Sequence, residues 1–554
     1  MSDIGRTFGS ITALPKRKNR DRQRVEKTSN EKNWIPRLQS ETFAPMYGTA
    51  GTGSEQIIAL APGAAIDLLC AGIRSLRKVG CRMVRPAKLS LMAGLCVLST
   101  ACATYKAEPI APLQTAAALD ARTLDDPRLR TFIDATAPSF AQTSSTWNLE
   151  KLTLAALYFH PDLDIAYAKL ATAEAAIRTA RQLPNPSLGL SPQFNVTNAN
   201  PSAWTVGTAI NLLLELFGKR AARTDQAKAL AEAARFDIGT ATWQVRGRVR
   251  TALIDLWTAQ QNVALTRGRL ELQQQLVGFL ERRLAVGEAS GLDVARERVN
   301  GNQFSLAVQD GQRDAADARA VLATAVGVPL QALDNVEPDL SAVTGAVAPP
   351  PPTIGLLRRL ALTGRSDIAS SLTQYEATQA GLRLQIANQY PNLTLGPSYT
   401  YDQGSNKFGL NLQADLPIFN QNQGPIAEAA ARRRQAAATF MALQAQIIGQ
   451  IDRAAVAYRT TTQSLRAADA LLAEQESRQA RTRDLFRAGQ IDHVALLAGD
   501  LEIANTRLGR LQALVSQRRA LGQIEDALQQ PIFMPATPTP APGARAGVQP
   551  EPAQ

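Results

Sequence analysis

The second half of this chain repeats the order of the first half, and this repeat constrains the fold more than any other feature. Three pairs of residues lie 202 positions apart: Phe217 and Phe419, Gly287 and Gly489, Pro329 and Pro531. Each copy reads as a short helix, a Pro-Asn break, two alternating strands, a very long helix, a glycine turn and another helix. Two strands and a helical hairpin leave open sheet edges, so the unit must assemble with other copies.

Positive charge is concentrated ahead of the repeats. Residues 1–82 carry 14 Lys/Arg and 7 Asp/Glu, a net charge of +7 out of +12 for the whole chain. With Arg85 and Lys88 set aside, residues 103–554 carry only about +3. The body also lacks an RNA-recognition motif, zinc-ligand spacing and a basic–aromatic stripe. The sequence therefore predicts no nucleic-acid partner.

The sequence predicts no metal site, no cofactor and no enzyme active site. The four cysteines all lie between Cys70 and Cys102, which excludes a disulfide framework or a cysteine-based metal site in the body. The two histidines, His160 and His493, fall on non-equivalent parts of the repeat, and we expect both on the surface. No nucleophile elbow, phosphate loop or metal motif accompanies them.

Residues 83–102 have the pattern of a bacterial secretion signal. A charged region with Arg85 and Lys88 precedes an apolar run that ends at Leu98, and small residues then lead to Cys102. The apolar run is too short for a stable membrane span. The cysteine at the cleavage point resembles a lipoprotein signal, which implies that Cys102 is acylated, for example with palmitate. The alternative is an ordinary signal peptide with an incidental cysteine.

This signal begins far from the N-terminus, and Met83 is a natural start. We therefore expect residues 1–82 to be an upstream extension of the gene model or a disordered head. The predicted organisation continues with an extended lead-in (103–147), a first repeat (148–337), a linker (338–353), a second repeat (354–530) and a disordered tail (531–554).

Two segments in each repeat alternate apolar and polar residues, which predicts strands. The expected strands cover about 187–195, 204–216, 393–402 and 407–417. Segments of this length with aromatic residues near their ends fit tilted membrane strands, although a soluble hairpin is the alternative. Four strands cannot close a barrel, and an open edge cannot lie in lipid, so the strands must come from several subunits.

Proline placement predicts the helices. Residues 150–182 have a helical period that ends at the prolines beginning with Pro184, while no proline occurs in 202–328 or 426–530. The uninterrupted pattern between Gly218 and Gly287 predicts one helix of about 100 Å. A periplasm-spanning tube needs such a length. A filamentous coiled coil is the alternative, and it leaves the strands unexplained.

A glycine turn ends each long helix. Gly287 and Gly489 suit the left-handed residue that follows a helix, and Ser290 and Asp492 stand where the N-cap of the next helix is expected. Two readings remain open for these turns: docking tips for a partner, or simple connections.

With these features together, the chain resembles the TolC family of outer-membrane efflux proteins over about 150–530. The resemblance rests on the order of elements, the tip turns, and motifs of the second repeat: Tyr390-Pro391-Asn392-Leu393 before a strand, Leu416-Pro417-Ile418-Phe419 after one, and Gly424 and Ala427 at the start of the long helix.

The resemblance implies a mainly α-helical protein with membrane β-strands, in which a homotrimer forms a 12-stranded outer-membrane barrel continued by an α-helical tunnel through the periplasm. It implies docking of the tips to a periplasmic adaptor that couples to an inner-membrane pump of the resistance–nodulation–division type. The expected function is passive export of metal ions or drugs. A type I protein-secretion duct and a periplasmic coiled-coil adaptor or structural protein are the alternatives.

The family also implies acidic side chains that narrow the periplasmic entrance just after the tip turns. Asp293 follows Gly287 at the expected place, but Ala495 occupies the equivalent position in the second repeat. Asp500 lies further along that helix. An acidic ring would favour cations, whereas solvated helix faces are the alternative for both acids.

Overall fold

The computed structural model describes residues 105–136, 146–197, 202–334, 336–339 and 353–532. The chain divides into two compact units, Met1–Ala107 and Glu108–Gln554, and every element named below belongs to the second unit. The predicted head, the signal with Cys102, most of the linker and the tail after residue 532 lie outside the described residues.

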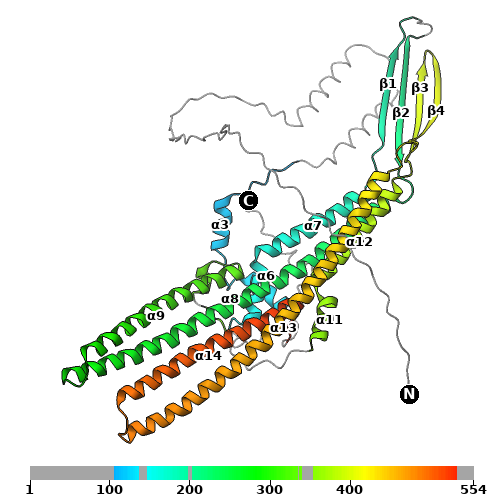
Figure 1. Cartoon of the computed structure of the whole chain (residues 1–554). Helices are drawn as coiled ribbons and strands as arrows, with labels where there is room; N and C mark the ends of the chain where they lie inside the picture. Colours follow the sequence, from blue (N-terminus) through cyan, green and yellow to red (C-terminus); the bar gives the residue numbers. More distant parts are fainter. Residues whose placement is uncertain (1–104, 137–145, 198–201, 335, 340–352, 533–554) are drawn as a thin grey trace, which may run out of the picture. The chain divides into compact units, whose positions relative to one another are not determined.

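Both halves share the order helix, helix, strand, strand, long helix, helix, and the first half adds two helices before it and a 3-10 helix after it (Figure 1). The first half contains α3 (Pro112–Asp120), α4 (Pro127–Thr136), α6 (Leu149–Phe159), α7 (Pro161–Arg181), β1 (Ser187–Phe194), β2 (Trp204–Leu214), α8 (Lys219–Ala285), α9 (Gly291–Val326) and the 3-10 helix η1 (Leu330–Leu333). The second half contains α11 (Ile354–Gly364), α12 (Ser366–Ala387), β3 (Leu393–Asp402), β4 (Ser405–Ala414), α13 (Gln423–Arg487) and α14 (His493–Leu528).

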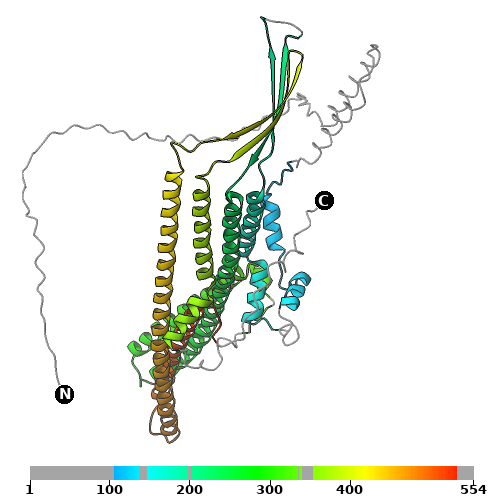
Figure 2. The same ribbon diagram turned by 90° about the vertical axis from the view of Figure 1, so that its right-hand side faces the viewer.

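The four strands form one antiparallel sheet in the order β1-β2-β3-β4, at one end of the long helices (Figure 2). The two halves meet at β2 and β3, where Leu212 lies opposite Leu395. The turn between β3 and β4 is tight, with positive φ at Gln403 and Gly404, as a two-residue hairpin requires. The predicted start of β4 at 407 is therefore wrong by two residues, and the strand ends at Ala414 rather than 417.

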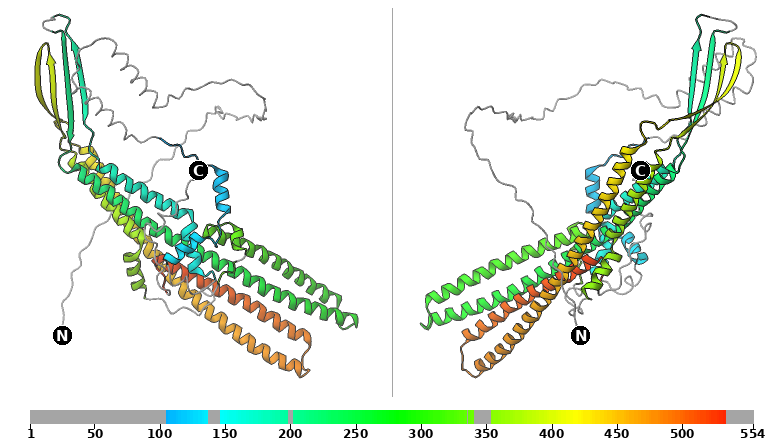
Figure 3. Two further views of the ribbon diagram at one scale, coloured as in Figure 1. Left: turned by 180° about the vertical axis from the view of Figure 1, so that it is seen from behind. Right: turned by 45° about the vertical axis from the view of Figure 1, so that its right-hand side comes forward.

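The long helices form two antiparallel hairpins, α8 with α9 and α13 with α14 (Figure 3). Helix α8 also packs against α14, and α7 and α12 flank it nearer the sheet. Each long helix begins after a residue with left-handed backbone, Gly218 in the first half and Asn422 in the second. Nearly one hundred ångströms of helix thus separate the strands from the tip turns, because 67 residues of α8 each add about 1.5 Å.

Each half has an apolar core where a short helix crosses the long ones. In the first half, α6 packs its Leu152 and Leu154 against Leu253 of α8 and Leu322 of α9, and all four side chains are fully buried. In the second half, α11 contributes Leu357 to a smaller core with residues of α13 and α14. The sheet contributes nothing to either core.

Three expectations for the first half are wrong. The lead-in is not extended, because α3 and α4 each begin at a proline in the first helical position, and α4 buries Leu129, Phe132 and Ile133. The helix expected over 150–182 is two helices, since the chain turns at His160 before Pro161. His160 is only 6% exposed and is not a surface residue.

Candidate functional site

One face of the sheet is mainly polar. Glycine and polar residues alternate with apolar ones along β1, β3 and β4, and in β2 this face carries Thr205, Gly207 and Asn211 together with Ala209 and Leu213. A Cβ at Gly207 would lie 2.5 Å from the Ser191 hydroxyl, and one at Gly396 would lie 2.7 Å from Asn211 Oδ1. These glycines therefore let polar side chains of neighbouring strands lie across them.

Charge on this polar face is paired near the β3–β4 turn. Lys407 Nζ donates to Asp402 Oδ2 at 2.6 Å, and Thr205 Oγ1 donates to Asp402 Oδ1 at 2.8 Å. A cavity of about 590 Å³ opens over this group, with Gln193 and Thr400 also in its wall. The acid on this face is therefore balanced by an adjacent lysine.

The opposite face of the sheet is apolar and exposed. Phe194 and Trp204 pack edge to face with centroids 5.0 Å apart, and Tyr399 and Phe408 lie 5.2 Å apart. Phe408 is 84% exposed in the single chain. An apolar sheet face with aromatic side chains near one end suits contact with a lipid bilayer.

A buried lysine joins the two halves where the sheet meets the helices. Lys219, the first residue of α8, is 6% exposed, and its Nζ donates to the Tyr390 carbonyl and to Asn392 Oδ1, both at 2.7 Å. Burial lowers the pKa of the Lys219 ammonium, while Glu215 opposes this shift. Phe217 stacks on Tyr390 with centroids 4.4 Å apart. These contacts fix the strands to the helices.

The predicted tip residues form the local structures expected of them. Gly287 and Gly489 have φ of 77° and 70°, which suits glycine. The Ser290 side chain accepts the Asp293 N–H at 3.1 Å, and the Asp492 side chain accepts the Ala495 N–H at 2.9 Å. Ser290 and Asp492 are therefore N-caps of α9 and α14.

The two tips of one chain also contact each other. Arg283 of α8 donates to Asp492 Oδ2 at 3.0 Å. His493 lies beside Phe279 of α8 and Phe486 of α13, with ring centroids 5.2 and 5.4 Å away. The hairpins are thereby linked at their ends through one ion pair and one aromatic cluster.

The two candidate entrance acids have different surroundings. Asp293 is in the first turn of α9, where its carboxylate accepts the Ser290 hydroxyl at 2.7 Å. Asp500 accepts from Gln479 Nε2 at 2.9 Å and from Arg483 at 2.8 Å. Asp500 is therefore balanced by a neighbouring arginine, whereas Asp293 is held by the hydroxyl of its own N-cap residue.

A buried glutamine links the helices of each hairpin. Gln273 of α8 donates to the carbonyl and the carboxylate of Glu297, and Gln479 of α13 donates to the Leu496 carbonyl and to Asp500. Both glutamines are at most 3% exposed. A polar group inside a helical interface sets the register of the two helices, so these residues position the tips.

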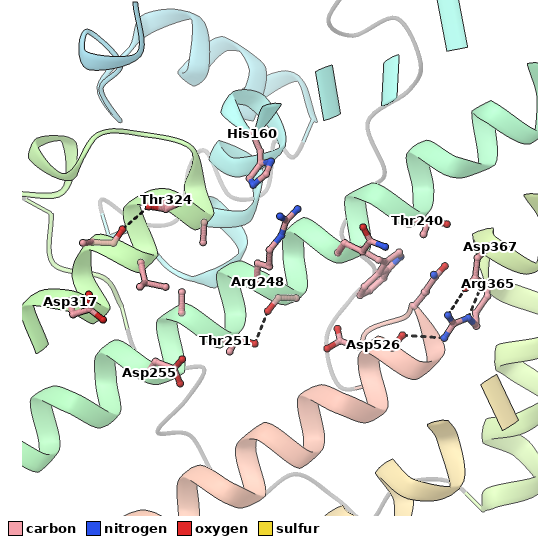
Figure 4. A pocket seen from close by; sticks show the side chains of 18 residues that line it. His160, Thr240, Arg248, Thr251, Asp255, Asp317, Thr324, Arg365, Asp367 and Asp526 are labelled. Carbon is pink, nitrogen blue, oxygen red and sulfur yellow. Dashed lines mark hydrogen bonds and ion pairs between the residues drawn. The ribbon is translucent and has the colours of Figure 1, made fainter. Parts of the chain in front are cut away.

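A cavity of about 1040 Å³ lies along α8 near the junction of the halves (Figure 4). His160 lies at its edge, and Arg365, Asp367 and Asp526 gather on its far side. Burial raises the pKa of Asp526, and Arg250 opposes that shift. The wall mixes acids and bases that largely pair with each other, so it does not define one ligand chemistry.

Beside this cavity, charged residues tie α8 to the end of α14. Glu525 Oε2 accepts from Arg246 at 3.1 Å and from Arg250 at 3.0 Å, and all three side chains are at most 10% exposed. Sequence reasoning missed this cluster and Lys219. In the sequence these residues stand out only as basic residues in an Ala-rich helix. That pattern does not identify the residues with which they pair.

Neither a metal site nor a membrane-spanning helix is found in the described part of the chain. Among the residues placed by the structure, no group of three or more His, Cys, Asp or Glu is arranged to hold a metal ion. Likewise, none of the helices listed above is long and apolar enough to cross a bilayer.

Comparison with known proteins identifies relatives over most of the body. Residues 154–328 match the family "Outer membrane efflux protein". The cobalt-zinc-cadmium resistance protein CzcC of Cupriavidus metallidurans is 25% identical over 375 residues, which cover 66% of this chain and 86% of CzcC. The pyoverdine export outer membrane protein OpmQ of Pseudomonas aeruginosa is 28% identical over 423 residues, covering 68% of this chain and 85% of OpmQ.

A solved structure shares the fold. The outer-membrane channel OprN superposes with a TM-score of 0.57 at 20% identity, covering 69% of this chain and 89% of that chain. At this identity the likeness concerns the arrangement of strands and helices alone.

Proposed function

We propose that this chain is a member of the outer membrane efflux protein family, whose model its residues 154–328 match, and that it acts as a channel in a tripartite export system and not as an enzyme. The chain is an outer-membrane efflux channel that extends into the periplasm. Its residues bind no cofactor and transform no substrate in this proposal. They form a wall along which cargo passes.

The observation that carries the mechanism is the two-faced, open-edged sheet joined to helices of 67 and 65 residues. An open sheet edge in lipid leaves backbone groups unsatisfied, so the edges must pair with other strands. Three copies with four strands each would give twelve strands. The polar face would then line water, the apolar face would contact lipid, and the duplicated helical hairpins would continue the wall as a tunnel.

The tip turns at Gly287 and Gly489 are the proposed contacts with a periplasmic adaptor, which couples to an inner-membrane pump. The N-caps Ser290 and Asp492, the buried glutamines and the Arg283–Asp492 pair support this role because they give the tips a fixed geometry. Docking by preformed surfaces avoids the cost of ordering a mobile loop on binding.

Asp293 and Asp500 are the proposed acids of the periplasmic entrance. Because Arg483 balances Asp500, we expect Asp293 to contribute more of the negative field felt by cargo. Cys102 is the proposed site of the lipid anchor in the outer membrane, on the strength of the signal pattern alone.

Cargo is set by the partner pump in this mechanism. One relative is named for resistance to cobalt, zinc and cadmium, and the other for pyoverdine export. We propose small molecules or metal ions as cargo, and protein secretion as the alternative.

The first experiment expresses the chain from Met83, extracts the outer-membrane fraction in detergent and measures the mass of the particle. A trimer that conducts ions in a planar lipid bilayer is the expected result. A soluble monomer or a filament would refute the duct. Replacing Gly287 and Gly489 with valine should then abolish adaptor capture while leaving the trimer intact, since valine disfavours positive φ.

A further inference from the structure

We propose that β4 of one copy pairs with β1 of the next in a single register, with Leu412 opposite Leu190. This inference rests on the proposed trimer and adds its residue-level contacts. Both strands end the sheet order, and among the described strands none lies beyond either of them. Leu190 and Leu412 are each 66% exposed. Edge strands carry unpaired backbone groups that direct pairing.

Two shifts relate the hairpins of the two halves. The Pro-Asn pairs that precede β1 and β3 begin at Pro184 and Pro391, 207 residues apart. The phenylalanines that follow β2 and β4, Phe217 and Phe419, lie 202 residues apart. If these shifts describe a true equivalence, each pair of opposite residues in the first hairpin must give a pair in the second.

The observed registers meet this requirement. Ser187 lies opposite Asn211 in the first hairpin. The two shifts convert this pair into Thr394 and Gln413, which lie opposite each other in the second hairpin. The same operation converts the pair Leu190–Thr208 into Pro397–Leu410, which is also observed.

The pairing of β2 with β3 then predicts the pairing of the free edges. Leu212 lies opposite Leu395, and Thr208 lies opposite Tyr399. The shifts place Ala414 opposite Leu188 of the next copy, and Leu410 opposite Pro192 of the next copy. Leu412 and Leu190 fall between these two pairs.

Side chains fit this register on the polar face. A slip of one residue between β4 and β1 would move every side chain of one strand to the other face. The proposed register instead places polar residues of β4 opposite polar residues of β1. Gln413 falls opposite Gly189 of the next copy, and Gly409 falls opposite its Gln193. The same pairing of a long amide with a glycine occurs inside the chain, where Asn211 lies over Gly396.

The apolar face gives independent support. Phe408 falls opposite Phe194 of the next copy, and each already packs with an aromatic neighbour in its own chain, Tyr399 and Trp204. The register therefore joins two aromatic pairs into one row of four rings across the seam. Cross-strand aromatic pairs stabilise sheets.

The same two shifts also relate residues at the junction between the sheet and the helices. Inside one chain, Phe217 stacks on Tyr390. The shifts assign these places at the seam to Phe419 and to Leu183 of the next copy, which are 97% and 66% exposed in the single chain. Both apolar side chains would be covered by assembly.

Disulfide cross-linking tests the register, since the sequence has no cysteine after Cys102. The double variant Leu412→Cys/Leu190→Cys should form covalent dimers and trimers on oxidation. Leu412→Cys with Leu188→Cys or Pro192→Cys should not, because a shift of two residues places the two residues about 7–8 Å apart, and Leu412→Cys with Phe194→Cys, shifted by four residues, is further apart still. Leu212→Cys/Leu395→Cys, opposite each other within one chain, is the control for oxidation.

The outcomes separate this inference from the duct itself. A trimer by mass that cross-links through one of the shifted pairs, or through none while the control reacts, overturns the register and leaves the duct standing. A monomer overturns both. Phe408→Cys/Phe194→Cys is a second in-register pair in case the first variant fails to reach the outer membrane, and its failure to cross-link in trimers would equally overturn the register.

Discussion

The two halves of the chain share their order of elements but close their cores with different residues. In the first half, Arg122 donates to the carbonyl of Phe159, which ends α6, and to that of Gly327, which follows α9. In the second half, Arg365 donates to the carbonyls of Asp526 and Ala527 at the end of α14. Carbonyls at a helix end need donors, and an arginine from a different part of the chain supplies them in each half.

This difference teaches that the repeat conserves a physical requirement rather than particular contacts. Gly327 follows α9 with a φ of 84°, and Gln529 follows α14 with a φ of 51°. The glycine is pressed against the Phe159 backbone, whereas the Gln529 side chain instead accepts the Ser366 N–H. Matched substitutions in the two halves should therefore change stability by different amounts, and sometimes in opposite directions.

The largest effect is expected where the halves are joined. Glu525→Ala leaves the buried Arg246 without its carboxylate and Arg250 with Asp526 alone, which should cost about 3–5 kcal/mol of unfolding free energy. Asp452→Ala removes the partner of Arg358, where both side chains are 40–44% exposed, and should cost far less because solvent screens an exposed ion pair. Denaturant unfolding of the detergent-solubilised protein measures both. Equal losses would show that the junction is not a special point of the fold.

Sequence patterns predicted the features that depend on neighbours in the chain. The tip glycines, the N-caps Ser290 and Asp492, and the strand faces all follow from local spacing. The Lys219–Asn392 contact joins residues 173 positions apart, and no periodicity connects them. Helix α4 was missed because its three buried residues are recognisable only once α6 supplies the surface that covers them.

A smaller effect, with opposite signs in the two halves, is expected from one glycine in each hairpin. A Cβ at Gly499 would lie 2.0 Å from Gln479 Oε1, whereas one at Gly301 would lie 3.7 Å from Gln273 Cγ. Gly499→Ala should displace the buried glutamine and cost about 1–3 kcal/mol. Gly301→Ala should stabilise by about 0.5–1 kcal/mol through helix propensity.

Thermal unfolding of the two glycine variants, side by side with the parent, gives the comparison. A stabilised Gly499→Ala protein would mean that Gln479 is not needed to hold the second hairpin in register.

The first half should also respond to pH through a cap that the second half lacks. His160 Nδ1 accepts the Asp162 N–H at the start of α7, and Arg365 at the equivalent start of α12 makes no such bond. Burial, with help from Arg248, lowers the pKa of His160 below 6.5, while Asp162 and Asp164 oppose the shift.

Because the unfolded chain binds this proton more tightly, the contribution of His160 is complete above pH 6.5 and is lost as the pH falls towards the lowered folded pKa. Loss of the cap should cost about 0.5–2 kcal/mol. His160→Asn keeps a capping oxygen without titrating. The melting temperatures of the parent and of His160→Asn should be measured from about pH 5 to about pH 8, the range in which histidine titrates. The two temperatures should converge or cross at low pH. A constant difference would exclude the cap as the source.

The smallest change in stability is expected from two ion pairs at equivalent sites, in which the acid and the base have exchanged places between the halves. Glu281 of α8 pairs with Arg298 of α9, and 202 residues later Arg483 of α13 pairs with Asp500 of α14. Exchanging the two charges of the first pair should change stability by less than about 0.5 kcal/mol, since both side chains are exposed.

The same exchange in the second half should cost more, because Asp500 is 21% exposed and also accepts from the buried Gln479. Arg483→Asp/Asp500→Arg leaves that amide facing a guanidinium, a donor opposite a donor, at a cost of about 1–3 kcal/mol for the unsatisfied group. Chemical denaturation of both exchanged proteins measures the contrast. Equal responses would mean that the glutamine finds another acceptor, and that the reversal of charge between the halves carries no structural consequence.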